Sequence, residues 1–215
     1  MNLPVFIVFE CTSFLVSLIV YFRRPTPLWL RLFPPLLLLT IATELTGYFI
    51  ASRGRSNGHV YNVYMVVSNF FFYYVLYQTS SNKKVRRYIL YTACLFPVAM
   101  LINFFIVGIL LFHSHAYSFG AISIVIFSAI NLVELMKRPG HPKLSHQPEF
   151  WITIGLLFFY ACSFPIISSF SLAKFWPFTV YDILVLVLKL LVCLFYSLFT
   201  IGFLCVAAKR KPPVN

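Results

Sequence analysis

Residues 179–206 read TVYDILVLVLKLLVCLFYSLFTIGFLCV, an apolar run that contains only two charged side chains, Asp182 and Lys189. A helix that crosses the hydrocarbon core of a bilayer needs about 20 mostly apolar residues, so this run predicts a membrane span. Six earlier stretches have the same character and predict further spans near residues 3–22, 28–50, 60–79, 88–112, 115–136 and 149–171. The expected fold class is therefore all-α, a polytopic membrane protein that forms a seven-transmembrane-helix bundle.

The composition of the chain supports this fold class independently. Of the 215 residues, 60% are hydrophobic and 10% are charged, and the mean hydropathy is +0.88. This composition leaves too little polar surface for a soluble protein of this length. The linkers are short, and no internal repeat or soluble-domain-sized insertion separates the spans. Residues 1–215 are therefore expected to form a single transmembrane domain.

The basic residues predict the orientation of the chain, because Lys and Arg concentrate in cytoplasmic loops. Thirteen of the 17 fall on one set of alternate linkers: Arg23, Arg24, Arg31, Lys83, Lys84, Arg86, Arg87, Lys137, Arg138, Lys143, Lys209, Arg210 and Lys211. The opposite linkers hold only Arg53, Arg55 and Lys174. We expect the N-terminus outside and the C-terminus in the cytoplasm. The net charge of +12 then reflects topology and anionic headgroups of the lipid bilayer, rather than a nucleic-acid partner.

Ionisable and amide side chains inside the spans are the candidate functional residues. A charged group in the bilayer core costs about 3 kcal/mol or more, so such groups usually face the interior of the bundle. At 1.5 Å per residue, the three ionisable side chains Glu10, Glu44 and Lys189 lie roughly 10–15 Å below the outer surface. We expect a polar cavity in the outer half, lined by the first, second, third and seventh spans, with these candidate residues: Glu10, Glu44, Asn69, Asn103 and Lys189.

Two interpretations of this polar group remain open. In the functional one, Lys189 pairs with Glu10 or Glu44 while the other carboxyl keeps its proton, because two buried carboxylates and one ammonium cannot all be ionised at low cost. That pairing requires the first and last spans to be neighbours, as in a ring of sequentially packed helices. In the structural one, the polar groups only fix helix register, through interhelical hydrogen bonds worth about 0.6 kcal/mol each.

The sequence offers no support for a metal, a cofactor or catalytic residues. His113 and His115 form an HxH pair without a nearby Cys, Asp or Glu, whereas protein metal sites need three or four ligands. A lysine in the last span is typical of microbial rhodopsins, but the third expected span has no acidic counter-ion and Asp182 lies seven residues before Lys189. No Ser-His-Asp or HExxH pattern is present. We therefore expect no cofactor and, on balance, no enzyme.

Three apolar motifs resemble those of a group of bacterial seven-span membrane proteins of about this length. They are LLLLTIATELTGYF at 36–49, FWITIGLLFFY at 150–160 followed by CSFP at 162–165, and YSLFTIGFLC at 196–205. The likeness covers the whole chain. It implies a seven-helix bundle in the bacterial inner membrane, and it carries over no activity and no functional residues.

Two classes of function fit these observations. The first is a binding or sensing module, in which the outer cavity accepts a small-molecule ligand and the short cytoplasmic loops contact a separate cytoplasmic or membrane protein partner. The second is a small transporter or proton-coupled permease that uses Glu10, Glu44 and Lys189. The lack of an inverted repeat argues against transport, and the lack of an output domain argues against sensing. We expect binding or sensing.

Overall fold

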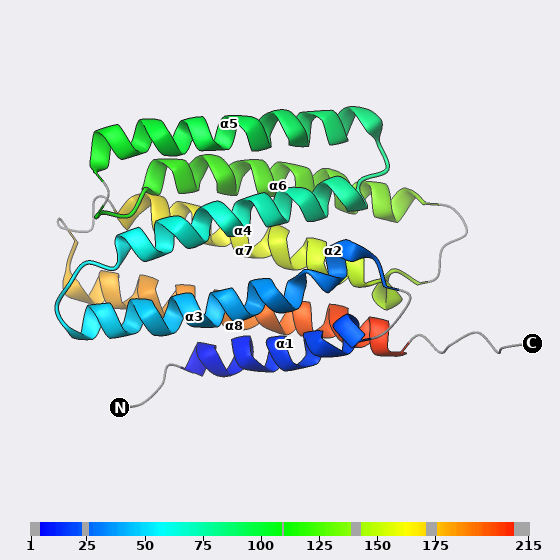
Figure 1. Ribbon diagram of the computed structural model, residues 1–215, viewed down its shortest axis with the longest axis horizontal. Coiled ribbons are helices and arrows are strands. Elements are labelled where there is room, and N and C mark those ends of the chain that lie inside the picture. Colours follow the sequence, from blue (N-terminus) through cyan, green and yellow to red (C-terminus); the bar gives the residue numbers. More distant parts are fainter. Residues whose placement is uncertain (1–4, 23–25, 109, 139–142, 171–175, 209–215) are drawn as a thin grey trace, which may run out of the picture.

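The structure is a computed structural model, and it describes residues 5–22, 26–108, 110–138, 143–170 and 176–208. Seven long helices, together with the short α2 (Leu28–Arg31) and the 3-10 helix η1 (Leu144–His146), make up this part of the chain (Figure 1). The long helices are α1 (Val5–Phe22), α3 (Phe33–Ser52), α4 (Gly58–Thr79), α5 (Lys83–Val107), α6 (Ser114–Lys137), α7 (Pro148–Ser169) and α8 (Phe178–Ala208). No strand occurs among the described residues, which confirms the all-α class.

Six segments are long and apolar enough to cross a membrane: α1, the combined α2 and α3, α5, α6, α7 and α8. The chain is therefore a multi-pass membrane protein. The exception is α4, which is 22 residues long but less apolar. Its buried face carries Asn62, Ser68, Asn69 and Thr79, so its polar residues are sheltered by neighbouring helices rather than exposed to lipid.

The helix boundaries follow local signals, and the helix expected at 88–112 is shifted at both ends. The helix expected at 88–112 begins at Lys83, because the Asn82 side chain caps it by accepting from the Lys84 backbone N–H at 2.9 Å. It ends at Val107, because Gly108 has a φ of 82° and a ψ of 169°, an extended positive-φ conformation that is open essentially to glycine and cannot continue an α-helix. The apolar residues after Gly108 thus belong to the connection between α5 and α6.

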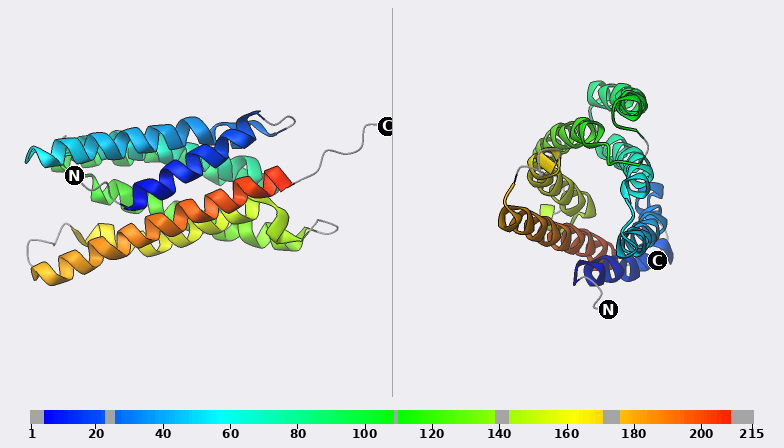
Figure 2. Two further views of the ribbon diagram at one scale, coloured as in Figure 1. Left: turned by 90° about the horizontal axis from the view of Figure 1, so that it is seen from below. Right: turned by 90° about the vertical axis from the view of Figure 1, so that its left-hand side faces the viewer.

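The helices close into a ring in the order α1, α3, α4, α6, α7, α8, and α8 packs back against α1 (Figure 2). The first and last spans are thus neighbours, as the expected Glu10–Lys189 pairing required. In contrast to a seven-membered ring, α5 lies outside and packs mainly against α4 and α6. Only three of its residues are buried: Ile89, Phe96 and Asn103. The interior of the ring is therefore built by six helices.

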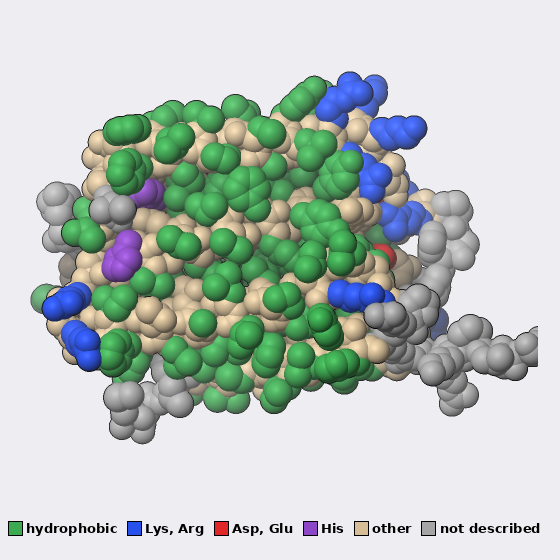
Figure 3. Space-filling view, viewed as in Figure 1, with side chains coloured by type: hydrophobic (Ala, Val, Ile, Leu, Met, Phe, Trp, Pro, Cys, Tyr) green, Lys and Arg blue, Asp and Glu red, His purple; other side chains and the backbone are tan. Residues whose placement is uncertain are grey.

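The bundle has two ends, the α3–α4 end and the α4–α5 end, each called after the helix–helix turn that lies there. The α3–α4 end holds Arg53 and Arg55, and the α4–α5 end holds most of the other described Lys and Arg residues (Figure 3). Apolar side chains such as Leu15, Phe105 and Ile126 are exposed on the flank between the ends, as lipid contact requires. Six basic residues used for the orientation lie outside the described residues: Arg23, Arg24, Lys174, Lys209, Arg210 and Lys211.

The ring is closed by aromatic packing in its α4–α5 half. Phe33 lies edge-on to the rings of Phe71, Phe199 and Phe203, with centroid distances of 4.8, 5.3 and 5.3 Å, a favourable geometry for aromatic pairs. Gly155 of α7 permits close approach to α8, because an added Cβ would lie 3.2 Å from the Phe199 ring. This half of the bundle has a dense apolar interior.

Candidate ligand-binding site

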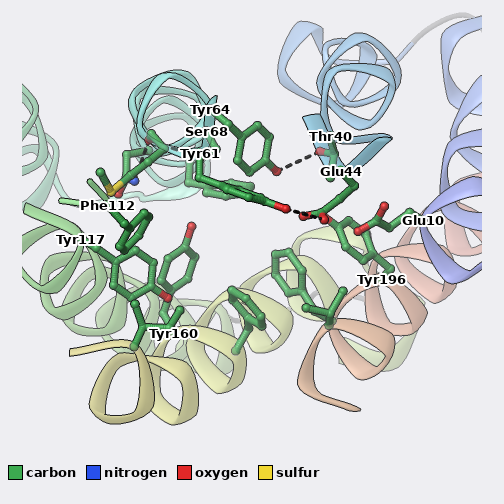
Figure 4. Close-up of a pocket in the computed structure, with 17 residues that line it drawn as sticks. Glu10, Thr40, Glu44, Tyr61, Tyr64, Ser68, Phe112, Tyr117, Tyr160 and Tyr196 are labelled. Carbon is green, nitrogen blue, oxygen red and sulfur yellow. Dashed lines mark hydrogen bonds between the residues drawn. The ribbon is translucent and has the colours of Figure 1, made fainter. Parts of the chain in front are cut away.

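A cavity of about 190 Å³ lies inside the ring (Figure 4). Its lining residues on α3 and α4 place it in the half of the bundle toward the α3–α4 end. All six ring helices contribute to its wall, and Phe112 from the α5–α6 connection contributes as well. The polar residues that line it are Glu10, Thr40, Glu44, Ser68 and Asn69, together with five tyrosines. The remaining wall is apolar, formed mainly by phenylalanine side chains.

Glu10 reaches the cavity from α1 because the buried face of this helix is the face that carries Glu10, Ser13 and Ser17. The buried residues of α1 are Ile7, Glu10, Ser13, Ser17 and Val20, at the three- and four-residue spacing that keeps side chains on one helix face. Only 1% of Glu10 is exposed. Its Oε2 atom is buried and has no hydrogen-bond partner among the described residues.

Glu44 enters from α3, and Gly47 shapes its surroundings. The Tyr61 hydroxyl of α4 donates a hydrogen bond to Glu44 Oε2 at 3.0 Å. A Cβ added at Gly47 would lie 2.7 Å from the Tyr61 hydroxyl oxygen, so only glycine leaves room for the tyrosine in this position. Figure 4 shows the carboxyl groups of Glu10 and Glu44 on the same side of the cavity, beside Tyr196. Glycine on α3 thus helps to position a hydrogen-bond donor for the carboxyl pair.

No described Lys, Arg or His forms an ion pair with either carboxyl group. The expected pairing with Lys189 is not present, because the Lys189 side chain is exposed on α8 and does not line the cavity. The physical reason is that α8 joins the core only beyond its first three turns. No residue from Phe178 to Leu190 is buried, and Leu191 is the first that is. Lys189 therefore lies outside the packed part of the ring.

The two amide residues differ in their placement. Asn69 lines the cavity and donates to the Met65 carbonyl at 2.8 Å. Its buried Oδ1 atom has no partner among the described residues and packs against Gly120 of α6, where an added Cβ would lie 2.5 Å from it. Asn103 is buried on α5 but does not line the cavity. In the amide orientation that satisfies its hydrogen bonds, its oxygen accepts from the Ala116 backbone N–H at 2.8 Å, in the first turn of α6. Asn103 is thus a helix-terminus cap rather than a ligand-binding residue.

The tyrosines of the wall are not among the candidate residues selected from the sequence. They are Tyr61, Tyr64, Tyr117, Tyr160 and Tyr196, and Phe72, Phe112, Phe159 and Phe195 complete the aromatic lining. Two of the tyrosine hydroxyls are hydrogen-bonded to other side-chain hydroxyls: Tyr64 to Thr40 at 2.8 Å and Tyr117 to Ser163 at 2.7 Å. A usable signal is the spacing of Tyr61, Tyr64, Ser68 and Asn69, which places them on one face of α4.

The chemistry of the site is that of an acceptor-rich, aromatic pocket. Among the described residues, no group of three or more His, Cys, Asp or Glu side chains gathers closely enough to hold a metal ion. His113 donates its backbone N–H to Asn62 at 2.9 Å, and its Nε2 atom lies 3.1 Å from the Gly108 carbonyl. These contacts hold the α5–α6 connection over the cavity and give the histidine a structural role.

Comparison of the chain with protein-family models, curated proteins and solved structures gives no match, so its function is inferred from the geometry of the cavity.

Proposed function

We propose that this chain is an integral membrane protein that binds a small molecule in the cavity enclosed by α1, α3, α4, α6, α7 and α8. The observation that carries the proposal is Glu10, a buried carboxyl on the cavity wall whose Oε2 atom has no partner in the part of the chain that the structure describes. An unsatisfied buried acceptor costs about 1–3 kcal/mol, more if it is charged. Because nearly all buried polar groups in folded proteins are satisfied, this oxygen is best explained by a molecule that occupies the cavity.

The size and lining of the cavity support a small, mostly apolar ligand. Its volume of about 190 Å³ is below the roughly 300–1,000 Å³ typical of drug-sized sites. Apolar surface dominates the wall, and the two carboxyls lie together on one side of it. A ligand with one polar end and a compact apolar body matches this distribution. Such a ligand also partitions into a bilayer.

We further propose a seven-span topology with the N-terminus outside and the C-terminus in the cytoplasm. The charge asymmetry of the linkers supports this orientation. The connectivity supports the seventh span, because α4 runs between two helices of membrane-spanning type, α3 and α5, through short turns at opposite ends. The cavity would then lie in the outer half of a bacterial inner-membrane protein. A binding or sensing role follows if occupancy is reported to a partner on the cytoplasmic side.

The experiment that tests small-molecule binding uses a cavity-filled variant. Ser68 is buried on the cavity wall, and Ser68→Phe should occupy part of the volume. The protein in uncharged detergent is screened by thermal unfolding against a library of small amphiphiles. A true ligand at 100 times its Kd should stabilise the wild type by about 2.7 kcal/mol and the filled variant much less. If every stabilising compound acts equally on both proteins, the cavity is not a binding site.

A second function, proton-coupled transport, has one observation in its favour. Two carboxyl groups, Glu10 and Glu44, lie together in the interior without a basic partner among the described residues, and such groups often mark proton pathways. Liposomes that contain the protein and a trapped pH indicator separate the two functions. Proton uptake that requires Glu10 and depends on an added solute would favour transport, whereas saturable binding without flux would favour a binding module.

A further inference from the structure

We infer that the ligand class of this cavity is a small organic cation, an amine or quaternary ammonium with compact apolar substituents. This inference rests on the proposed binding function and specifies its chemistry. Three independent features of the cavity carry it: the charge of its lining residues, the kind of polar atom left without a partner, and the aromatic faces around it.

The charged lining residues are acidic alone. Glu10 and Glu44 line the cavity, and none of the described Lys, Arg or His residues does. Within the described part of the chain neither carboxyl forms an ion pair, and the nearest candidate expected from the sequence, Lys189, is exposed on α8. A charge removed from water is stable only when it is paired or hydrogen-bonded. A monovalent cation in the cavity would therefore supply the partner that the protein itself does not.

One buried acceptor of the wall suits a donor ligand. Among the described residues, Glu10 Oε2 is buried without a partner, and Glu10 is only 1% exposed. An ionised carboxylate only accepts hydrogen bonds, and a primary, secondary or tertiary ammonium group has N–H donors and no acceptor. Asn69 Oδ1 also has no partner among these residues, but it packs against Gly120 of α6, where an added Cβ would lie 2.5 Å from it, so it is not counted as a ligand contact.

The aromatic lining suits the remainder of a cation. Nine of the 17 lining residues are Tyr or Phe, and a cation within about 6 Å of an aromatic face is attracted by the negative face of the ring. Figure 4 shows Tyr61, Tyr64 and Tyr196 around the carboxyl side of the cavity. Aromatic cages of this kind bind quaternary ammonium groups. Apolar residues such as Val192 and Ile167 line other parts of the wall, where alkyl substituents would pack.

The test compares cations with neutral molecules of the same shape. Isothermal titration of the full chain in uncharged detergent, at constant ionic strength, uses choline against 3,3-dimethyl-1-butanol and n-butylammonium against 1-butanol. We expect at least one cation to bind the wild type at least about tenfold more tightly than its neutral counterpart, since hydrogen bonds and contacts to a charged group are the stronger ones. Equal or tighter binding of the neutral molecules would overturn the inference.

Variants locate the binding to the carboxyl pair. Glu10→Gln and Glu44→Gln preserve the shape of the side chain and remove its charge. Each should lower the affinity for the cation that binds the wild type by about tenfold or more. Asp182→Asn is the matched control: it removes the same charge from an exposed position of α8 and should change affinity less than about twofold. Cation binding that survives both Gln substitutions would also refute the assignment. Circular dichroism and size-exclusion chromatography check that each variant is folded.

The outcomes separate this inference from the proposed function on which it rests. If the neutral molecules bind and Ser68→Phe blocks them, the cavity is a binding site and only the cationic class is wrong. If no probe binds, the cation inference fails, and the amphiphile screen with the same filled variant still decides whether the cavity binds other molecules. If the cations bind and Ser68→Phe has no effect, the cations bind elsewhere and the inference is refuted.

Discussion

Gly47→Ala is the substitution whose effect can be worked most directly from the structure. Gly47 lies on the buried face of α3, and the Tyr61 hydroxyl of α4 passes over it to reach Glu44. The new Cβ would be 2.7 Å from the hydroxyl oxygen, whereas ordinary contacts begin at 3.4 Å. The ring must therefore retreat by about 0.7 Å. A retreat along the hydrogen bond would lengthen the present 3.0 Å contact to about 3.7 Å, which is too long for a hydrogen bond.

The expected magnitude combines two terms of opposite sign. Loss of a hydrogen bond to a carboxyl group costs about 1.5–3 kcal/mol if that group is charged. Replacement of glycine by alanine within a helix contributes about 1 kcal/mol in the other direction. The net expectation is that Gly47→Ala destabilises the protein by about 0.5–2 kcal/mol. Ala42→Gly, on the exposed face of the same helix, measures the helix-propensity term separately.

The assay is a double-mutant cycle with Tyr61→Phe, read by equilibrium unfolding in detergent micelles. In the Tyr61→Phe background there is no hydrogen bond left to lose, so Gly47→Ala should be less costly there by about 1 kcal/mol or more. Coupling of this size is expected only between residues in contact. Additive effects of the two substitutions, or a Gly47→Ala variant more stable than the wild type, would refute the proposed role of Gly47.

Four further predictions concern the fold and its topology. Lys189→Met should change the free energy of unfolding by less than about 0.5 kcal/mol, because the lysine is exposed and unpaired among the described residues. A loss of several kcal/mol in chemical denaturation would instead indicate that Lys189 takes part in a buried ion pair. Gly58→Ala should destabilise by about 1–3 kcal/mol, since the added Cβ would meet backbone atoms of Leu110 and Phe112 at 2.7 Å, and unchanged thermal unfolding would contradict this packing. Asn103→Ala should cost about 0.5–2 kcal/mol through loss of a helix cap while leaving ligand affinity in the cavity unchanged, as measured by titration. In a variant whose native cysteines are replaced, Lys84→Cys should react with a membrane-impermeant thiol reagent only after cell lysis; labelling in intact cells would reverse the proposed orientation.

The carboxyl pair was accessible to sequence reasoning because charge inside an apolar run is rare and expensive. Glu10 and Glu44 could be selected on that basis, and both line the cavity. The same reasoning was wrong for Lys189, because a long side chain on a helix that extends past its neighbours can remain outside the core. It also misplaced Asn103, whose partner is a backbone amide at the start of another helix.

Sequence alone determined the helical class, the multi-pass character and most helix boundaries of this protein. These properties depend on transfer of each segment into lipid and on local stops such as Gly108, and a segment's own residues decide both. Only the tertiary structure decided that α5 lies outside the ring, that α8 leaves Lys189 exposed, and that tyrosines from several helices surround the carboxyl pair. Those outcomes depend on which helices pack together and at what depth. In a bilayer, that choice comes from close packing of side chains between segments far apart in the chain, and no local pattern of apolar residues encodes it.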